Sequence, residues 1–391
     1  MPASGTQSAA MKLSSSRRQD VLEHLLALDT DDRAQLHLVA PFEERSAKPF
    51  GTWIGVGVCL ALAIAASLVS RYAQSNGMTV GTLTVALVFG VLLGNLLPRQ
   101  TDACTGGISF SKKFLLRLGI VLYGFRLTLA DFEAGGIAMV LIDSLVVLST
   151  FFLAVQIGVR LLKIDRDTAT LIGAGSSICG ASAVLAAAGV IRATPAQTAV
   201  AISTVAVFGT AALLLYPLLS HLSLSGVLLP GGVRGYGVFI GSTVHEVAQV
   251  IAIASASGSD AADPAIVTKM GRVALLSPFL MALAFWRRRP AEELRGATGH
   301  WSSALPWFPF LFAAAVLVNS LAPVREARAA IGWVDGMGLA TAMVALGAST
   351  RLAAIRQAGP KPLLLAGCLF IWLVLAGALI NAAVTTFVSS I

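Results

Sequence analysis

Ionisable side chains within long apolar stretches are the residues of this sequence that could do chemistry. The segment Gly241–Gln249 reads Gly-Ser-Thr-Val-His-Glu-Val-Ala-Gln and sets His245 beside Glu246 among apolar residues. Removing such groups from water must be compensated, so within a membrane span they mark a functional site by default. Because histidine titrates near neutrality, His245 could carry a proton in a coupled cycle. The alternative is a hydrogen-bonded His–Glu pair that only holds helices together.

Helix geometry divides this segment into faces. Adjacent residues point about 100° apart, so His245 and Glu246 do not form one patch. His245 and Gln249 lie four residues apart and share a face with Ser242, and Thr243 adds a second hydroxyl. The zinc signature His-Glu-x-x-His needs a second histidine where this sequence has Gln249. We therefore expect no metal, no cofactor and no catalytic residue, and the chain is not predicted to be an enzyme.

Four cations lie within or at the ends of apolar stretches. Lys269 and Arg272 are three residues apart and share a helix face, and Arg117 and Arg126 bracket a second apolar run. Arginine suits multidentate contacts with oxyanions, whereas lysine acts more as a point charge. As a group these cations favour an anionic substrate over a cationic one. For each of them the alternative is a structural role, which includes snorkelling to the interface or pairing with a carboxylate. The candidate carboxylates are Asp131, Asp143 and Glu246.

Two apolar stretches, 171–184 and 335–350, are interrupted by glycine and small hydroxyl residues. Glycine costs about 1 kcal/mol in a helix interior, so both stretches are predicted to be broken helices. Unwound backbone at membrane depth is tolerated where it lines a cavity, and half-helix N-termini there suit anions. The alternative is close helix packing through small residues. The residues expected to contact substrate are Gly175, Ser176, Ser177, Gly180 and Ser182 in the first stretch, and Ser349 and Thr350 in the second.

The composition indicates which elements position these residues. Of the 391 residues, 56% are hydrophobic and 12% are charged, about half the charge of a soluble domain. The apolar runs approach the roughly 20 residues that span a bilayer as a helix, which predicts an all-α polytopic membrane protein. The net charge of +8 comes from basic residues between these runs, so nucleic acid is not an expected partner. The four cysteines show no paired spacing, which makes a disulfide or a thiolate site improbable.

Eleven membrane spans are predicted, and the basic residues orient them. The spans are 50–70, 80–97, 112–129, 137–162, 170–188, 198–219, 234–254, 265–286, 304–321, 337–355 and 363–388. Most of the 28 Lys and Arg residues, Arg234 among them, then fall on the side of the N-terminus. The opposite side holds Arg71, Arg192, Arg325 and Arg328. This asymmetry predicts a cytoplasmic N-terminus and a periplasmic C-terminus.

The predicted spans suggest an internal repeat. Residues 1–49 form a cytoplasmic tail with a candidate amphipathic helix, and 50–79 hold an additional first span. The remaining ten spans divide into two sets of five, 80–225 and 226–391, and an odd-numbered repeat inverts its second copy. The two interrupted stretches become the fourth span of each set. Paired broken helices in inverted repeats point to a transporter site.

Five motifs also resemble a known family, the YeiH-like sulfate exporter family of the cation:proton antiporter and anion transporter superfamily. The motifs lie within residues 116–126, 173–184, 241–249, 269–278 and 345–350, and the resemblance extends over 80–361. It implies two inverted five-helix repeats with crossed, broken helices, and export of sulfate. The tail of residues 1–49 lies outside it.

We therefore predict a secondary active transporter of the inner membrane that moves a small anion by alternating access, with sulfate or a related sulfur oxyanion as the first candidate. The expected partners are that anionic solute, the lipid bilayer and a coupling proton or sodium ion, with a homodimer left open. One alternative is a cation or proton antiporter on the same scaffold. Another is a membrane sensor that transports nothing, for which the N-terminal tail is the support.

Overall fold

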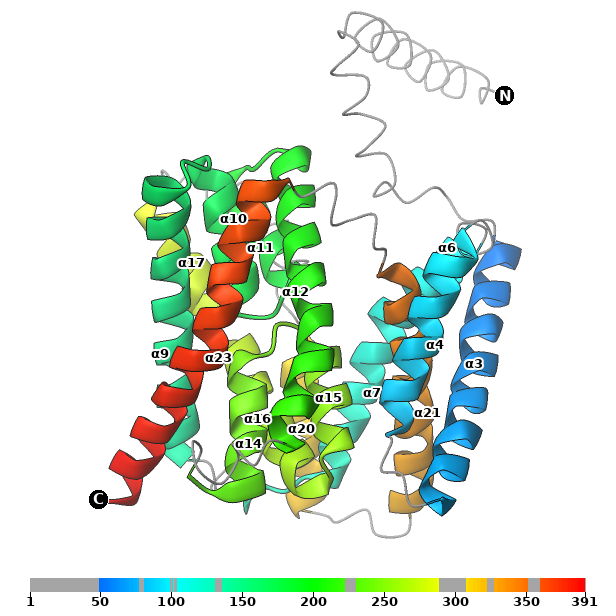
Figure 1. Cartoon of the computed structure of the whole chain (residues 1–391). Helices are drawn as coiled ribbons and strands as arrows, with labels where there is room; N and C mark the ends of the chain where they lie inside the picture. Colours follow the sequence, from blue (N-terminus) through cyan, green and yellow to red (C-terminus); the bar gives the residue numbers. More distant parts are fainter. Residues whose placement is uncertain are drawn as a thin grey trace, which may run out of the picture. The chain divides into compact units, whose positions relative to one another are not determined.

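The chain is helical throughout the part that the computed structural model describes, which is residues 49–76, 81–98, 101, 104–130, 136–221, 230–287, 307–321, 327–350 and 359–390 (Figure 1). Each of the eleven predicted spans contains helix, so the all-α prediction is confirmed. Among the described residues, six helices are long and apolar enough to cross a membrane. The candidate amphipathic helix in the tail lies outside the described residues.

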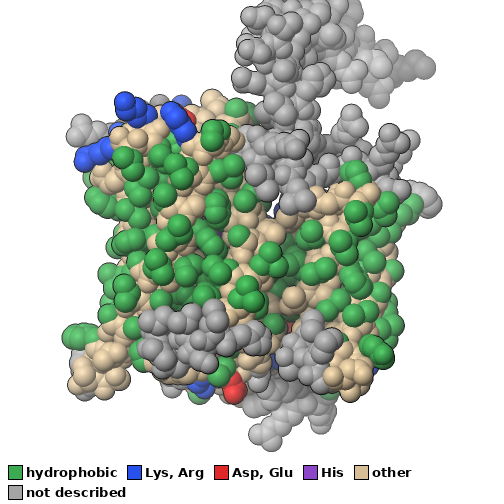
Figure 2. Space-filling model, in the orientation of Figure 1, with side chains coloured by type: hydrophobic (Ala, Val, Ile, Leu, Met, Phe, Trp, Pro, Cys, Tyr) green, Lys and Arg blue, Asp and Glu red, His purple; other side chains and the backbone are tan. Residues whose placement is uncertain are grey.

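The flanks of the bundle are apolar. Figure 2 shows hydrophobic side chains spread over the visible face, with Lys and Arg gathered mainly near one end. Large hydrophobic side chains such as Leu148, Phe285 and Leu375 are 66%, 85% and 63% exposed. So broad an exposed apolar surface has a favourable environment in lipid and not in water. The described helices therefore have the surface of a membrane protein.

One set of helices, here called the flanking group, packs around α21 and α7. It consists of α3 (Pro49–Ser75), α4 (Thr82–Leu96), α6 (Thr105–Phe110), η2 (Ser111–Leu115), α7 (Leu116–Tyr123), η3 (Gly124–Arg126), α20 (Phe308–Leu321) and α21 (Arg328–Ser349). Glycines let α4 and α21 touch backbone to backbone, because Gly90 lies against Val344 and Gly94 against Ala348. Both pairs advance together, so α4 and α21 run in the same direction.

The second set, here called the hairpin group, contains the helices that form the candidate site. It consists of α9 (Gly136–Val155), η4 (Gln156–Leu161), α10 (Arg166–Ser177), α11 (Ala181–Ile191), α12 (Pro195–His221), α14 (Gly232–Thr243), α15 (Val247–Ala256), α16 (Ser259–Ala274), α17 (Leu276–Trp286) and α23 (Pro360–Ser389). Helix α15 packs against α4 and α21, and α16 against α20, which joins the two groups.

Helices α10 and α11 form a hairpin that enters and leaves at one end of the bundle. They have 12 and 11 residues, or about 18 and 16 Å at 1.5 Å per residue, roughly half of a bilayer core. Asp165 caps α10 by accepting from the Thr168 amide, and it also accepts from Gln197 Nε2 in the first turn of α12 at 2.8 Å. The segment thus returns to its starting end, and it reverses at Gly180, whose φ is 76°.

Helices α14 and α15 form a second hairpin, with 12 and 10 residues. Gly237 of α14 packs on Ala261 of α16, and Gly241 packs on Ala265, so α14 and α16 run in the same direction. Two residues separate α15 from α16. Helix α15 therefore ends where α16 begins, which is the end of the bundle where α14 also begins.

The two hairpins enter from opposite ends. Helix α17 continues α16 and leads to Arg287, which forms an ion pair with Asp167 in the first turn of α10. At the same place the Arg166 guanidinium lies over the Trp286 ring, 4.5 Å from its centroid. The end of α17 therefore lies beside the start of the first hairpin, and the start of α16 beside the second hairpin lies at the other end.

The structure corrects the prediction of two broken helices at 171–184 and 335–350. The first stretch is broken, but residues 335–349 of the second lie within the continuous helix α21, and Thr350 is its C-cap. Gly347 packs its backbone against Leu87 and Val91 of α4, so small residues there serve close helix contact. The second interruption lies instead at 244–246, in the predicted seventh span. The two breaks do not occupy matching places in the sets 80–225 and 226–391, and the inverted repeat stays a prediction.

Candidate functional site

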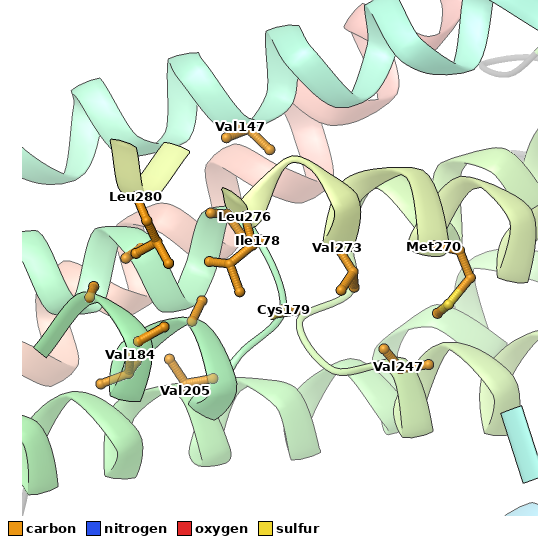
Figure 3. Packing of buried hydrophobic residues seen from close by; sticks show 14 of the residues in the cluster. Val147, Ile178, Cys179, Val184, Val205, Val247, Met270, Val273, Leu276 and Leu280 are labelled. Atoms are coloured by element: carbon orange, nitrogen blue, oxygen red, sulfur yellow. The ribbon is translucent and has the colours of Figure 1, made fainter. Parts of the chain in front are cut away.

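The tips of the two hairpins meet within the bundle. We call this place the crossing and define it as residues 176–180 and 243–246. A Cβ atom at Gly180 would lie 2.6 Å from Cγ of Glu246, so the tips are in van der Waals contact. Figure 3 shows Ile178 and Cys179 on the loop of the first tip, with Val247 at the start of α15. The crossing thus brings together two helix C-termini, of α10 and α14, and two helix N-termini, of α11 and α15.

Two fully buried cations of α16 bind the helix C-termini. Lys269 Nζ donates to the carbonyl oxygens of Ile178 at 2.8 Å and Val244 at 2.7 Å. Arg272 donates from Nε to Ser177 O at 2.6 Å, from Nη2 to Ser176 O at 2.8 Å and from Nη1 to Val244 O at 3.1 Å. Both side chains are 0% exposed.

These hydrogen bonds place positive charge at the negative ends of two helices. The last carbonyls of a helix have no intrahelical partner and carry the negative end of its dipole. Hydrogen bonds from a charged donor to such acceptors are among the stronger ones. Lys269 and Arg272 therefore join the two hairpins and neutralise both negative ends. The prediction that they share a helix face holds, and their observed partners are backbone carbonyls of the protein.

Glu246 occupies the helix N-termini. It is the N-cap of α15, where its side chain accepts from the N3 amide while Gln249 Oε1 accepts from the Glu246 amide at 3.2 Å. Gln249 has room because Gly209 of α12 lies against it. The Glu246 side chain also covers Gly180, the N-cap of α11, with Oε1 3.3 Å from the position of a Cβ there. A half-buried carboxylate thus lies at the positive ends of two half-helices.

Asp143 of α9 completes the charges at the crossing. It is 1% exposed and interacts electrostatically with both Arg272 and Lys269. Its Oδ1 atom is buried without a hydrogen-bond partner among the described residues. The sequence pattern presents Asp143 only as a pairing partner for the cations. A stronger signal exists, because it is the one ionisable residue within 136–159.

The predicted residues Ser242, Thr243 and His245 lie at the second tip and contact the neighbouring helices. Ser242 Oγ accepts from Asn381 Nδ2 of α23 at 3.0 Å, and Thr243 Oγ1 accepts from the hydroxyl of Tyr216 of α12 at 2.8 Å. His245 is 1% exposed, its ring stacks on Phe370 of α23, and its Nδ1 atom has no partner among the described residues. The Ser242 and Thr243 hydroxyls therefore fix the tip between α12 and α23.

The first tip combines buried and accessible residues. Gly175 is covered by Val184 and Val205, and the Ser177 hydroxyl donates to the Ala174 carbonyl of its own helix at 3.3 Å. Ser176 Oγ is fully buried without a hydrogen-bond partner among the described residues. Ser182 is exposed in the first turn of α11, and its hydroxyl contacts the Cys179 thiol at 2.8 Å. The N-terminus of α11 is thus the accessible part of this tip.

Three predicted site residues lie away from the crossing. Ser349 and Thr350 end α21, and their hydroxyls donate to Ala345 and Leu346 of the same helix. The Thr350 carbonyl accepts from Asn95 of the flanking group. Arg117 lies in α7, also in the flanking group. None of the three lies at the crossing, and their assignment to the substrate site stays a prediction.

A second polar cluster joins the two groups of helices. The Tyr123 hydroxyl of α7 donates to Asp263 Oδ1 of α16 at 2.8 Å, and the Arg126 guanidinium lies over the Tyr123 ring, 4.4 Å from its centroid. Arg126 also contacts Oδ2 of the buried Asp335 at 3.5 Å. Tyr123, Arg126 and Asp335 line a cavity of about 1020 Å³ between α3, α21 and the second hairpin.

Comparison with known proteins identifies a sequence family that matches this chain. The family described as Conserved hypothetical protein 698 matches residues 54–366. The chain is 46% identical to a UPF0324 membrane protein of Pseudomonas aeruginosa over 82% of this chain and 92% of that protein. It is 42% identical to the UPF0324 inner membrane protein YeiH of Escherichia coli K12, over 80% and 88% of the two chains. No solved structure matches the chain.

Proposed function

The chain belongs to the Conserved hypothetical protein 698 family of multi-pass inner-membrane proteins, and from that premise we propose that it is a secondary transporter of a small anion. The observation that carries the proposal is the meeting of two half-length hairpins that enter from opposite ends. Interrupted helices at the middle of a membrane are the usual location of a transporter's substrate site. The first candidate remains a sulfur oxyanion.

The charge of the helix ends supports an anion. Lys269 and Arg272 already neutralise the C-terminal ends of α10 and α14. The two positive helix ends at the crossing are the N-termini of α11 and α15, where an anion would bind in place of the Glu246 side chain that covers them. Ser182 in the first turn of α11 is exposed. An oxyanion bound there would accept hydrogen bonds from amides and from the Ser182 hydroxyl, which would turn to it from the Cys179 carbonyl that it donates to at 3.1 Å.

The division into two groups of helices supports alternating access. The crossing lies within the hairpin group, and few elements connect this group to the flanking group. A movement of one group against the other would expose the crossing to each side in turn. The tips themselves, held by the bonds of Lys269 and Arg272, would move as one body.

Flux measurements on the purified protein in liposomes test this proposal. We expect uptake of labelled sulfite, sulfate or methanesulfonate above that of protein-free vesicles, and competition among the anions that are transported. Ser182→Ala should raise the KM for the transported anion several-fold. Absence of flux for every anion, together with movement of sodium or protons alone, would show that the proposal is wrong.

One observation favours the alternative of a cation or proton antiporter. Glu246 lies in the crossing and Asp143 of α9 lies beside its two cations, and Oδ1 of Asp143 is buried without a partner among the described residues. Carboxylates inside a membrane span are typical of proton and sodium pathways. In this alternative, sodium or proton flux would persist without any transported anion, and Asp143→Asn would abolish it.

A further inference from the structure

We infer that the Glu246 carboxylate occupies the substrate's place, and that Glu246 leaves this place when it is protonated. The protein would then move one proton together with each monovalent oxyanion. The inference rests on the proposed function and adds the charge of the substrate and the coupling ion. Its basis is the position of one carboxylate at the N-termini of both α11 and α15.

The position of Glu246 is unusual because it serves two helices. A capping side chain ordinarily belongs to its own helix, as Glu246 does in the capping box with Gln249. Here the same side chain also contacts Gly180, the N-cap of α11. Any side chain at position 180 would displace it, since a Cβ would come within 2.6 Å of Glu246 Cγ. A substrate oxyanion at these amides and Glu246 as a carboxylate exclude each other.

The other charges at the crossing determine the stoichiometry. Lys269 and Arg272 carry two formal positive charges and Asp143 and Glu246 carry two formal negative charges, so the formal net charge of the closed crossing is zero. Uncompensated charge is expensive in a site surrounded by apolar side chains. A monovalent anion that enters with a proton on Glu246 keeps the total charge at zero. A divalent anion with one proton does not.

The surrounding ionisable groups leave Glu246 as the coupling group. Lys269 and Arg272 are held by carbonyls of both tips, and Asp143 lies beside these cations. His245, which precedes Glu246, is almost fully buried on Phe370, whereas Glu246 is half-buried. Cys179 lies at the first tip. The other ionisable residues on the described helices that pack against α15 are Asp260 and Asp263 of α16, Arg234 and Tyr236 of α14, Tyr216 and His221 of α12, and Arg328 and Asp335 of α21.

The inference predicts which anion is moved and how. Methanesulfonate or hydrogensulfite, each with one negative charge, should be transported in preference to sulfate. With a proton on Glu246 the complex that crosses is neutral. Transport should therefore respond to a pH gradient and be unaffected by the membrane potential.

The test uses the full chain in liposomes that contain a pH-sensitive dye. For wild-type protein we expect one proton to enter with each labelled methanesulfonate, and an inward-directed proton gradient to raise accumulation at least tenfold. A potassium diffusion potential should leave the rate unchanged. Anion flux without proton entry, flux driven by the potential, or transport of sulfate alone would overturn the inference while leaving anion transport established. If none of these anions moves, the inference falls together with the proposed function.

Glu246→Gln separates coupling from transport. The amide oxygen of glutamine can still accept from the N3 amide, so the cap of α15 is retained. We expect exchange of labelled for unlabelled methanesulfonate to persist and gradient-driven accumulation to fall at least tenfold. The matched control is Asp260→Asn, an exposed acid in the first turn of α16, which should keep full coupling. Accumulation retained in Glu246→Gln would overturn the inference, and the wild-type proton-to-anion ratio decides it even if this variant does not fold.

Discussion

At the scale of single residues, the bonds of Lys269 and Arg272 explain why charged side chains are found at full burial. Five charge-assisted hydrogen bonds connect these two residues of α16 to carbonyls of the two hairpin tips. Removing one partner of such a network leaves buried acceptors unpaired, which costs about 1–3 kcal/mol per group. We therefore expect substitution of either side chain to lower the stability of the fold, whatever its effect on transport.

The first prediction concerns Lys269→Met, which keeps the length of the side chain and removes its donors. The Ile178 carbonyl loses this donor and the Val244 carbonyl keeps only Arg272, so we expect the free energy of unfolding to fall by about 2 kcal/mol. Thermal unfolding of the detergent-solubilised protein measures the change. Lys361→Met, at an exposed lysine of α23, is the control and should leave the melting temperature unchanged. Equal melting of both variants would contradict a structural role for Lys269.

The second prediction compares two glycines of the first hairpin. Gly180 has φ 76° and ψ −137°, and a Cβ there would meet Glu246. Backbone strain of this kind costs on the order of 1–3 kcal/mol for a residue other than glycine, so Gly180→Ala should lower the melting temperature and abolish anion flux. Gly189 lies in α11 with open space around it. Gly189→Ala should be neutral or stabilise by about 0.5–1 kcal/mol, and a similar loss in both variants would refute the contact.

The sequence predicted the chemistry of the crossing better than its connections. Gly180, Glu246, Lys269 and Arg272 could be identified because glycine and ionisable residues are conspicuous in apolar stretches. Their partners could not be, since Lys269 and Arg272 bind carbonyls 91 to 96 residues earlier in the chain. Every residue has such a carbonyl, so no side-chain pattern indicates which ones are used.

At the scale of elements, two segments predicted to span the membrane fold as half-length hairpins. Residues 170–188 and 234–254 have the length and hydrophobicity of spans, and periodicity does not separate one long helix from two short ones. The glycines and serines of the first segment did indicate the interruption. In the second, the sequence His245-Glu246 marks the break, because Glu246 caps a new helix there. In the sequence this pair indicates ionisable chemistry, and a helix start there becomes visible only from the contacts of Glu246 with Gln249.

The predicted orientation of the other helices is the same whether these two segments are full spans or half-length hairpins. Each hairpin removes one crossing of the membrane, and two removals restore the alternation for every later span. Only the segment between the hairpins changes, so Arg192, at the end of α11, moves to the predicted cytoplasmic side and Arg234, in α14, to the opposite side. Each side of the membrane gains one arginine and loses one, so the numbers of Lys and Arg on the two predicted sides are unchanged. The sidedness itself stays a prediction.

The third prediction tests this topology directly. In a protein whose four native cysteines are replaced, Lys163→Cys and Arg192→Cys should react with a membrane-impermeant maleimide from the same side. Arg234→Cys should react from the other side. All three positions are exposed. A protein with eleven spans would instead expose Lys163 and Arg234 on one side and Arg192 on the opposite side, so the labelling pattern decides between the two topologies.

At the scale of the whole molecule, transport by the proposed mechanism needs the hairpin group to move against the flanking group. The contacts that such a movement would break include the hydrogen bond between Tyr123 and Asp263 and the contact of Gly81, the cap of α4, with Ala256 at the end of α15. Both join an element of one group to an element of the other.

The fourth prediction uses the second contact as a lock. A Cβ at Gly81 would lie 3.7 Å from Cβ of Ala256, which fits the usual separation of about 3.5–4.5 Å in disulfides. In the cysteine-free background, Gly81→Cys with Ala256→Cys should lose anion flux on oxidation and regain it on reduction. Each single variant is a control that should not respond to oxidant. Full flux in the oxidised double variant would show that these two elements need not separate.

The long sequence distance between the first tip and its cations also sets an order of assembly. During synthesis the end of α10 leaves the ribosome more than ninety residues ahead of Lys269 and Arg272. Until these residues are inserted, the end carbonyls of α10 must be satisfied by water or by the translocation machinery. The centre of the molecule is therefore completed late, and a nascent chain that stops before α16 should keep its first hairpin open to solvent and to proteases.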